Sequence, residues 1–120
     1  MKQVVLVVED EPLILMGAVD FVESAGFEAL EARNADEAIR LLERRSDIAL
    51  VFTDVDMPGT MDGLRLAHAV RERWPPVFLL LASGKAILKE SDLPAGARFF
   101  SKPYSEESIT NTMRQLLKAA

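Results

Sequence analysis

The chain has 120 residues, 49% of them hydrophobic and 28% charged, which is typical of one globular domain spanning residues 1–120 and leaves little room for a second. Its formal net charge is −5 and its basic residues form no cluster, so neither nucleic acid nor an anionic membrane surface is an expected partner. Because the chain has no cysteine and its apolar runs are far shorter than the roughly 20 residues of a membrane span, the sequence predicts a cytoplasmic protein without disulfides.

The first part of the chain predicts two strand-helix units. Val4–Val8 is short, apolar and rich in β-branched residues, as a strand buried on both faces would be. Pro12 suits the first position of the helix that follows. We expect this helix to bury a stripe formed by Ile14, Ala18, Phe21, Val22 and Ala25. A weaker strand over residues 27–31 and a helix that begins after Asn34 come next.

A third strand is predicted from residue 48 and ends at an acid. The apolar run 48–52 is followed by Thr53 and Asp54, and Pro58-Gly59 then turns the chain. A carboxylate at the carboxyl end of a parallel strand lies at the edge of the sheet where open α/β folds bind their ligands. Asp54 is therefore the candidate for the chemistry of this protein.

The remaining elements continue the alternation of strands and helices. Asp62 can cap a helix that ends before Pro75-Pro76, and a strand over residues 77–81 then leads to Ser83. Residues 85–94 contain few apolar side chains, which predicts a short or irregular helix. The last strand, at residues 97–100, leads to Lys102 and to a final helix that opens at residues 105–107.

Five strands that alternate with helices predict a flavodoxin-like (βα)5 fold, which is a doubly wound parallel sheet. The strand order would be 2-1-3-4-5, with the fourth helix short or irregular. In this order strands one and three are neighbours. Asp10, after the first strand, and Asp54, at the end of the third, would then share one edge of the sheet.

Several side chains at this edge indicate phosphoryl chemistry. Glu9, Asp10 and Asp54 are three like charges, which are unfavourable together unless a cation neutralises them, and carboxylate oxygens suit Mg²⁺. Ser83 and Lys102 supply a hydroxyl donor and a cation for the oxygens of a phosphoryl group. Any one of these residues could be a helix cap or a solvated side chain, but their joint placement at successive strand ends favours a site.

The chain resembles the receiver domain of two-component response regulators along essentially its whole length, and the resemblance is to a stand-alone receiver. The motifs that carry it are Val8-Glu9-Asp10-Glu11-Pro12, Asp54-Val55-Asp56-Met57-Pro58, Met61-Asp62-Gly63, Ala82-Ser83-Gly84 and Lys102-Pro103-Tyr104. Three departures accompany it. The loop after Pro58 is one residue longer, Ser83 replaces a commoner threonine, and the interval from Ser83 to Lys102 is a few residues shorter than usual.

The resemblance implies a role for each site residue. Asp54 would accept a phosphoryl group from the phosphohistidine of a histidine kinase or histidine phosphotransferase, and Ser83 and Lys102 would bind that group. Mg²⁺ would be held by the carboxylates of Glu9, Asp10 and Asp54 and by the main-chain carbonyl of Asp56. The resemblance also implies that Phe99 is the aromatic residue that reports the state of Ser83, and that the Lys102–Pro103 bond is cis.

The leading functional hypothesis is a signalling receiver that acts through another protein and catalyses only its own phosphorylation and dephosphorylation. A haloacid-dehalogenase-like phosphatase is the alternative, because Asp54 and Asp56 form an Asp-x-Asp motif. Pro58, and a chain too short for a substrate-covering lid, disfavour it. A degenerate flavodoxin-like interaction module would not need the full set of site residues.

The first helix also carries a candidate partner face. Residues 13–16 are all apolar, although a surface helix usually buries only one stripe. At roughly 100° per residue, Leu13 and Met16 lie away from the expected stripe. Because both follow the acidic turn at residues 9–11, we expect them to contact the phosphohistidine donor.

Overall fold

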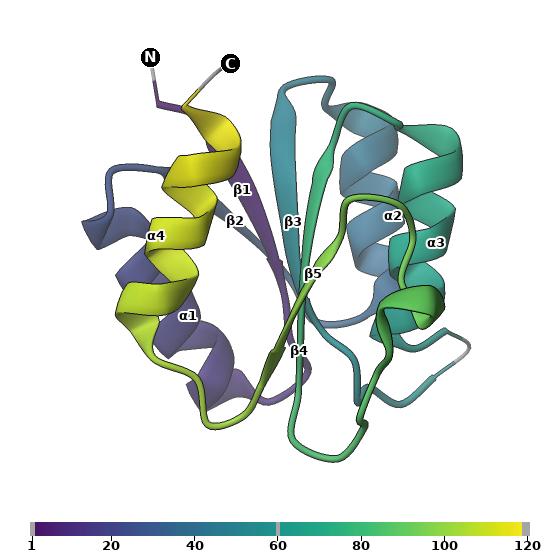
Figure 1. Cartoon of the computed structure of the whole chain (residues 1–120). Coiled ribbons are helices and arrows are strands. Elements are labelled where there is room, and N and C mark those ends of the chain that lie inside the picture. Colours follow the sequence, from purple (N-terminus) through teal and green to yellow (C-terminus); the bar gives the residue numbers. More distant parts are fainter. Residues whose placement is uncertain (1, 60, 119–120) are drawn as a thin grey trace.

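A computed structural model describes residues 2–59 and 61–118, and it has a five-stranded parallel sheet with helices on both faces (Figure 1). The strand order is β2-β1-β3-β4-β5, which confirms the flavodoxin-like prediction. The elements are β1 (Val4–Val8), α1 (Pro12–Ser24), β2 (Glu28–Ala32), α2 (Ala35–Arg44), β3 (Ile48–Asp54), α3 (Gly63–Arg73), β4 (Phe78–Ser83), the 3₁₀ turn η1 (Glu90–Asp92), β5 (Arg98–Ser101) and α4 (Glu106–Leu117).

The sheet separates two hydrophobic cores, because successive side chains of a strand point to opposite faces. On one face, Val5 and Val7 of β1 pack with α1 and α4. On the other face, Val4, Leu6 and Val8 pack with α2 and α3. Figure 1 shows the same division, with α1 and α4 on one side of the sheet and α2 and α3 on the other. The apolar run of β1 therefore serves both cores, as expected of a strand buried on both faces.

The first helix buries most of the predicted stripe but differs from the prediction at its first residue. Its fully buried residues are Leu15, Ala18 and Val22, whereas Ile14 is 42% exposed, so the placement of Ile14 on the buried stripe was wrong. Ala18 and Val22 were placed correctly. An apolar run that covers a whole turn does not fix which side faces the sheet, and here Leu15 rather than Ile14 supplies the first buried contact.

The predicted helix caps are present. Asn34 Oδ1 accepts a hydrogen bond from the backbone N–H of Glu37 at 2.9 Å, and Asp62 Oδ1 accepts one from the N–H of Arg65 at 2.9 Å. Each cap satisfies a backbone donor that a helix start leaves free. Within residues 2–59 and 61–118, none of the helices combines the length and the apolar content that crossing a bilayer requires.

The predicted short or irregular fourth helix is reduced to η1, a single 3₁₀ turn over Glu90–Asp92. The side chains of α3 hold this segment in place. His68 Nε2 lies 2.9 Å from the carbonyl oxygen of Asp92, and Arg71 Nε donates to the carbonyl of Ala95 at 2.9 Å. These contacts join His68 and Arg71 of α3 to the segment between β4 and β5.

The strand register aligns the carboxyl ends that carry the candidate site. Val8 pairs with Thr53, Asp54 with Ala82, and Ser83 with Ser101. The residues that leave these strands therefore emerge along one edge of the sheet. The second, fourth and fifth strands begin one residue later than the sequence predicted. Of the longer loop after Pro58, Thr60 lies outside the described residues.

Candidate functional site

Three carboxylates meet at the carboxyl edge of β1 and β3. Glu9 and Asp10 follow β1, Asp54 ends β3, and one ligand oxygen from each residue lies within 4.8 Å of the others. Glu9 and Asp54 are buried, so their charges are poorly screened by water. The predicted cluster is therefore present in the fold, and its oxygens are close enough to share one cation.

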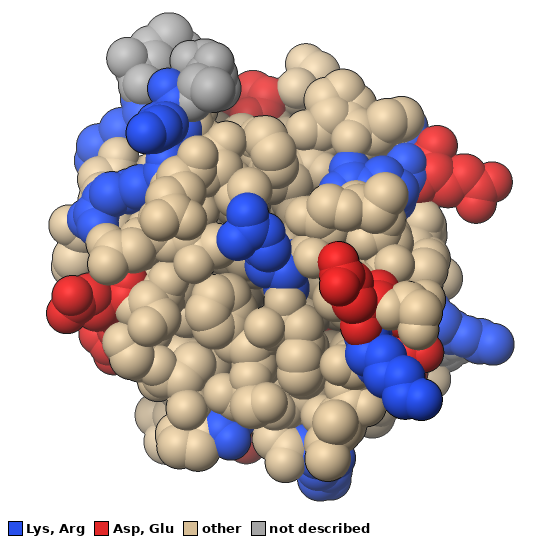
Figure 2. Space-filling model, in the orientation of Figure 1, with Lys and Arg blue, Asp and Glu red and all other residues tan. Residues whose placement is uncertain are grey.

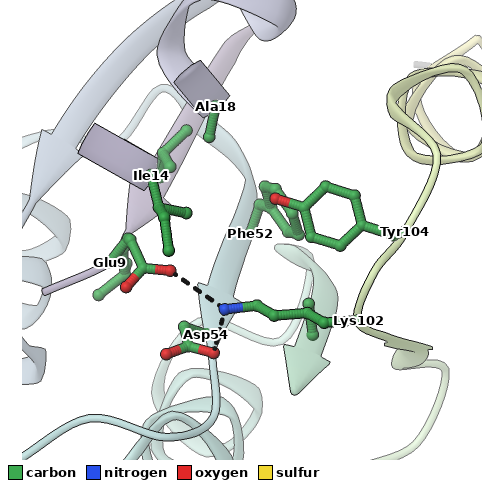
Figure 3. A pocket seen from close by; sticks show the side chains of 10 residues that line it. Glu9, Ile14, Ala18, Phe52, Asp54, Lys102 and Tyr104 are labelled. Atoms are coloured by element: carbon green, nitrogen blue, oxygen red, sulfur yellow. Dashed lines mark hydrogen bonds and ion pairs between the residues drawn. The ribbon is translucent and has the colours of Figure 1, made fainter. Parts of the chain in front are cut away.

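Lys102 reaches into this cluster from the loop after β5. Its Nζ lies 3.0 Å from Asp54 Oδ1 and 3.4 Å from Glu9 Oε1, and Figure 3 shows the three side chains converging on one point. The 3.0 Å contact is an ion pair, and within the part of the chain that the structure describes Asp54 Oδ1 has no hydrogen-bond partner. A buried carboxylate oxygen without a hydrogen bond is uncommon in folded proteins, and a bound cation or a chemical role would account for it.

Burial makes the charged forms of Glu9 and Asp54 less favourable, and the ammonium of Lys102 offsets this effect on their pKa values only in part. Burial raises the pKa of Asp54, and the neighbouring Lys102 only partly opposes it. Burial also raises the pKa of Glu9, against a hydrogen bond from the N–H of Glu11. For Lys102, burial would lower the pKa, but Asp54 and Glu9 outweigh it and the pKa is raised. The site thus favours additional positive charge.

Ser83 is held by a side chain that the sequence did not suggest. Its Oγ donates to Asp56 Oδ2 at 2.6 Å and accepts hydrogen bonds from the N–H groups of Ala86 at 2.8 Å and Lys85 at 3.2 Å. The family resemblance implied that Asp56 belongs to the site through its main-chain carbonyl. The interaction of its carboxylate with Ser83 depends on the turn after β3, which the sequence pattern alone does not specify.

Gly63, the last residue of the Met61-Asp62-Gly63 motif, has a structural role that the sequence alone does not reveal. Its N–H donates to the carbonyl of Val55 at 3.0 Å. A Cβ at this position would overlap the carbonyl group of Asp54 and would come 2.8 Å from Val55 Cα. The start of α3 can therefore lie directly against the backbone of Asp54 only because residue 63 has no side chain.

Phe99 and Tyr104 lie on opposite faces of the sheet. Phe99 pairs in register with Leu81 and packs, partly buried, against the core below α2 and α3. Tyr104 makes edge-on contacts with Phe21 and Phe52 on the other face. The structure thus places Phe99 on the strand next to that of Ser83, while Tyr104 borders Lys102 in the pocket of Figure 3.

The candidate partner face is exposed. Leu13 is 76% exposed, Met16 is 61% exposed and Ile14 is 42% exposed. Ile14 also lines the pocket that contains Asp54 and Lys102. Figure 2 shows the face seen in Figure 1, where uncharged side chains predominate and acidic and basic residues are scattered.

Comparison with known proteins agrees with this geometry. A family model described as "Response regulator receiver domain" matches residues 5–114. The chain is 34% identical over 118 residues to Sensor kinase CckA of Brucella abortus (strain 2308), covering 95% of this chain and 12% of that protein. It is 29% identical over 119 residues to Response regulator receiver protein CpdR of the same strain, covering 97% of this chain and 98% of CpdR.

Solved structures give the same result. A response regulator receiver protein from Sinorhizobium medicae WSM419 superposes with a TM-score of 0.90 at 26% identity, covering 98% of this chain and 96% of that one. The response regulator protein TrrA from Thermotoga maritima, in complex with Mg(2+)-BeF, superposes with a TM-score of 0.82 at 25% identity, covering 98% of this chain and 100% of TrrA. The chain spans only 12% of CckA and 25% of the transcriptional regulator HoxA of Cupriavidus necator.

Proposed function

From its membership of the response regulator receiver domain family, to which the chain belongs over residues 5–114, we propose that phosphorylation of Asp54 switches this protein between two signalling states. The chain is a receiver domain, the phosphorylation-switched module of response regulators. One observation carries the assignment to Asp54. Its buried Oδ1, which lacks a hydrogen bond within the described residues, lies beside the Lys102 ammonium and inside a cluster of three carboxylates.

In the proposed reaction a carboxylate oxygen of Asp54 attacks the phosphorus of a phosphohistidine. The new P–O bond forms as the P–N bond breaks. The electron pair of the P–N bond leaves with the imidazole of the donor, which takes a proton from solvent. The product is an acyl phosphate on Asp54. Lys102, which already lies 3.0 Å from Asp54 Oδ1, is placed to neutralise the phosphoryl oxygens, and Ser83 is the hydroxyl donor to them.

The same cluster is the proposed site for Mg²⁺. Oxygens of Glu9, Asp10 and Asp54 within 4.8 Å of one another form the hard, anionic donor set that this ion prefers. The carbonyl oxygen of Asp56 would complete the protein ligands. Bound Mg²⁺ would neutralise the carboxylates and draw phosphoryl oxygens toward Asp54. The relative TrrA is described in complex with Mg(2+)-BeF, which supports a site of this kind.

We propose a histidine kinase or a histidine phosphotransferase as the phosphoryl donor, docked on Leu13 and Met16. A donor histidine must come within bonding distance of Asp54, and this exposed apolar surface begins directly after the acidic turn that carries Glu9. The protein would catalyse only its own phosphorylation and dephosphorylation. It would signal through a partner protein. A single receiver domain over residues 1–120 and a cytoplasmic location remain predictions from the sequence.

The haloacid-dehalogenase-like alternative receives no support from the comparisons, whose matches are receiver domains and proteins that contain them.

The proposal is tested by incubating the protein with Mg²⁺ and acetyl phosphate and locating the phosphate by mass spectrometry. We expect labelling at Asp54 that requires Mg²⁺ and disappears in Asp54→Asn. Asp20→Asn, which makes the same change at an exposed position of α1, serves as the matched control and should label normally. Undiminished labelling of Asp54→Asn at another residue would overturn the assignment.

A further inference from the structure

We propose that the side chain of Asp56 is a latch on Ser83, holding its hydroxyl away from the phosphoryl group until that group competes for it. This inference rests on the proposed function, since it concerns how Ser83 is released for the phosphorylated state. The role is distinct from that of the Asp56 main-chain carbonyl, which is a proposed metal ligand. Asp56 is thus a positioning residue that acts through Ser83.

The hydroxyl of Ser83 has no hydrogen-bonding position left for a phosphoryl group. A hydroxyl has one proton to donate and two lone pairs that can accept. The proton goes to Asp56 Oδ2 at 2.6 Å, and the lone pairs accept the N–H groups of Lys85 and Ala86. Every hydrogen-bonding position of this buried hydroxyl is therefore occupied. Ser83 can donate to a phosphoryl oxygen only after its proton leaves Asp56.

The hydrogen bond between Ser83 and Asp56 has the length of a strong one. A distance of 2.6 Å lies in the range of charge-assisted O–H···O⁻ bonds, which are roughly twice as strong as neutral ones. Ser83 is only 1% exposed, so water competes weakly for its proton. In the unphosphorylated domain the hydroxyl of Ser83 would therefore stay bonded to Asp56. A phosphoryl group on Asp54 must compete with this strong hydrogen bond to bind Ser83.

Charge also couples Asp56 to the site of phosphorylation. Asp56 lies two residues after Asp54, and its partner Ser83 directly follows Ala82, which pairs in register with Asp54. A phosphoryl group on Asp54 would add negative charge near Asp56 and draw the Ser83 proton toward its own oxygens. The latch thus opposes phosphorylation through a competing hydrogen bond and through like-charge repulsion, and an experiment must separate these two effects.

The latch also links the site to the segment between β4 and β5, which contains only the 3₁₀ turn η1 and no regular helix. Ser83 Oγ accepts the N–H groups of Lys85 and Ala86, which begin the irregular stretch leading to η1. A change of partner at Ser83 would alter the anchor of this stretch. The residues after β4 would then respond to the state of Asp54 without the movement of a regular helix.

The test measures the affinity of beryllofluoride, a tetrahedral mimic of the phosphoryl group, in the presence of Mg²⁺. The proteins compared are the unaltered chain, Asp56→Ala, Asp56→Asn, Ser83→Ala and the two double variants. Asp56→Ala removes both charge and acceptor, whereas Asp56→Asn removes the charge but keeps an acceptor for Ser83. Variants of Asp56 in the Ser83→Ala background report the charge effect alone, because no hydroxyl is left to hold.

We expect Asp56→Ala to bind beryllofluoride about tenfold more tightly than the unaltered chain, a ratio equivalent to about 1.4 kcal/mol. Asp56→Asn should gain less than Asp56→Ala, and the two variants should differ little once Ser83 is alanine. Equal gains for Asp56→Ala in both backgrounds, or equal gains for Ala and Asn, would show that only charge matters and would overturn the latch.

Two further outcomes separate this inference from the proposed function. If the unaltered chain shows no Mg²⁺-dependent binding of beryllofluoride, the proposed function is wrong and the latch fails with it. Normal binding without coupling between residues 56 and 83 overturns the latch alone. Amide resonances of Lys85 and Ala86 give a second measurement on the unaltered chain, since these N–H groups should shift when Ser83 changes its partner. Unchanged resonances would contradict the inference even if a variant failed to fold.

Discussion

Replacement of Gly63 by alanine should displace the backbone that carries Asp54. The new Cβ would overlap the carbonyl group of Asp54 and come 2.8 Å from Val55 Cα. Both contacts are with main-chain atoms, which cannot rotate away as a flexible side chain would. The start of α3 or the end of β3 must therefore move, and the Asp54 carboxylate moves with it.

The expected cost can be estimated from known overpacking effects. Forcing an extra carbon into a filled space typically costs about 1–3 kcal/mol, and the rigid main-chain contacts place Gly63→Ala near the upper end, at about 3 kcal/mol. The better helix propensity of alanine offsets less than about 1 kcal/mol. For a chain of 120 residues, the entropy of unfolding is such that a loss of 1 kcal/mol in the free energy of unfolding lowers the midpoint of thermal unfolding by about 4 °C. We therefore expect the midpoint of thermal unfolding to fall by about 8–12 °C.

Gly17→Ala is the matched control. Gly17 lies inside α1, and a Cβ built there meets no atom within 4 Å, so alanine should stabilise the protein by roughly 0.5–1 kcal/mol. Urea and thermal unfolding of both variants measure the difference. If Gly63→Ala were as stable as the unaltered chain and bound Mg²⁺ equally well, the close approach of α3 to Asp54 would not constrain the site, and this reasoning would be wrong.

Three other perturbations have defined outcomes. Lys102→Ala should keep or raise the Mg²⁺ affinity, because Nζ occupies the same carboxylate oxygens, while beryllofluoride binding should weaken about tenfold. The double change Leu13→Glu with Met16→Glu should slow phosphorylation by the histidine donor but not by acetyl phosphate. Because burial raises the pKa of Asp54 and of Glu9, the folded state holds protons that the unfolded state releases. Without Mg²⁺, the contribution of these two carboxyl groups to the free energy of unfolding should therefore fall as the pH rises through their raised pKa values. Urea unfolding at several pH values measures this fall, which added Mg²⁺ should remove.

Each of these predictions has its own control. Asp10→Ala should lose Mg²⁺ affinity, and an equal loss in Lys102→Ala would contradict the role given to the lysine. Asn111→Glu with Gln115→Glu adds the same two charges on the exposed face of α4 and should leave the histidine donor unaffected. Equal loss with both donors in the α1 variant would indicate a damaged site, and unchanged rates would refute the docking face. A stability profile that rises with pH without Mg²⁺ would contradict the assigned carboxyl protonation.

The sequence predicted the positions of the site residues because each follows an apolar run that ends abruptly. Glu9, Asp54 and Ser83 can be recognised in the sequence because each lies at the end of a predicted strand. Parallel pairing of the strands then brings them to one edge of the sheet. The reduced fourth helix was also predictable, since Pro94 and Gly96 bound a segment that lacks an apolar stripe.

Features that depend on tertiary contacts were not predictable in this way. The phase of α1 was ambiguous because its first turn is apolar on all sides, and packing against the sheet selected Leu15 over Ile14. The pairing of Ser83 with Asp56 requires the conformation of the turn after β3. The need for glycine at position 63 arises only when α3 lies against the backbone of Asp54.

The central claim is that a carboxylate oxygen of Asp54 becomes the acyl phosphate, and chemical trapping tests it most directly. After phosphorylation with Mg²⁺ and a phosphohistidine donor, borohydride reduces an acyl phosphate to an alcohol, which converts a phosphorylated aspartate to homoserine. Peptide mass spectrometry should then find homoserine at position 54, in amounts that depend on Mg²⁺ and on the donor. Homoserine at another aspartate, or phosphate retained on a hydroxyl or imidazole side chain with Asp54 unchanged, would contradict the account.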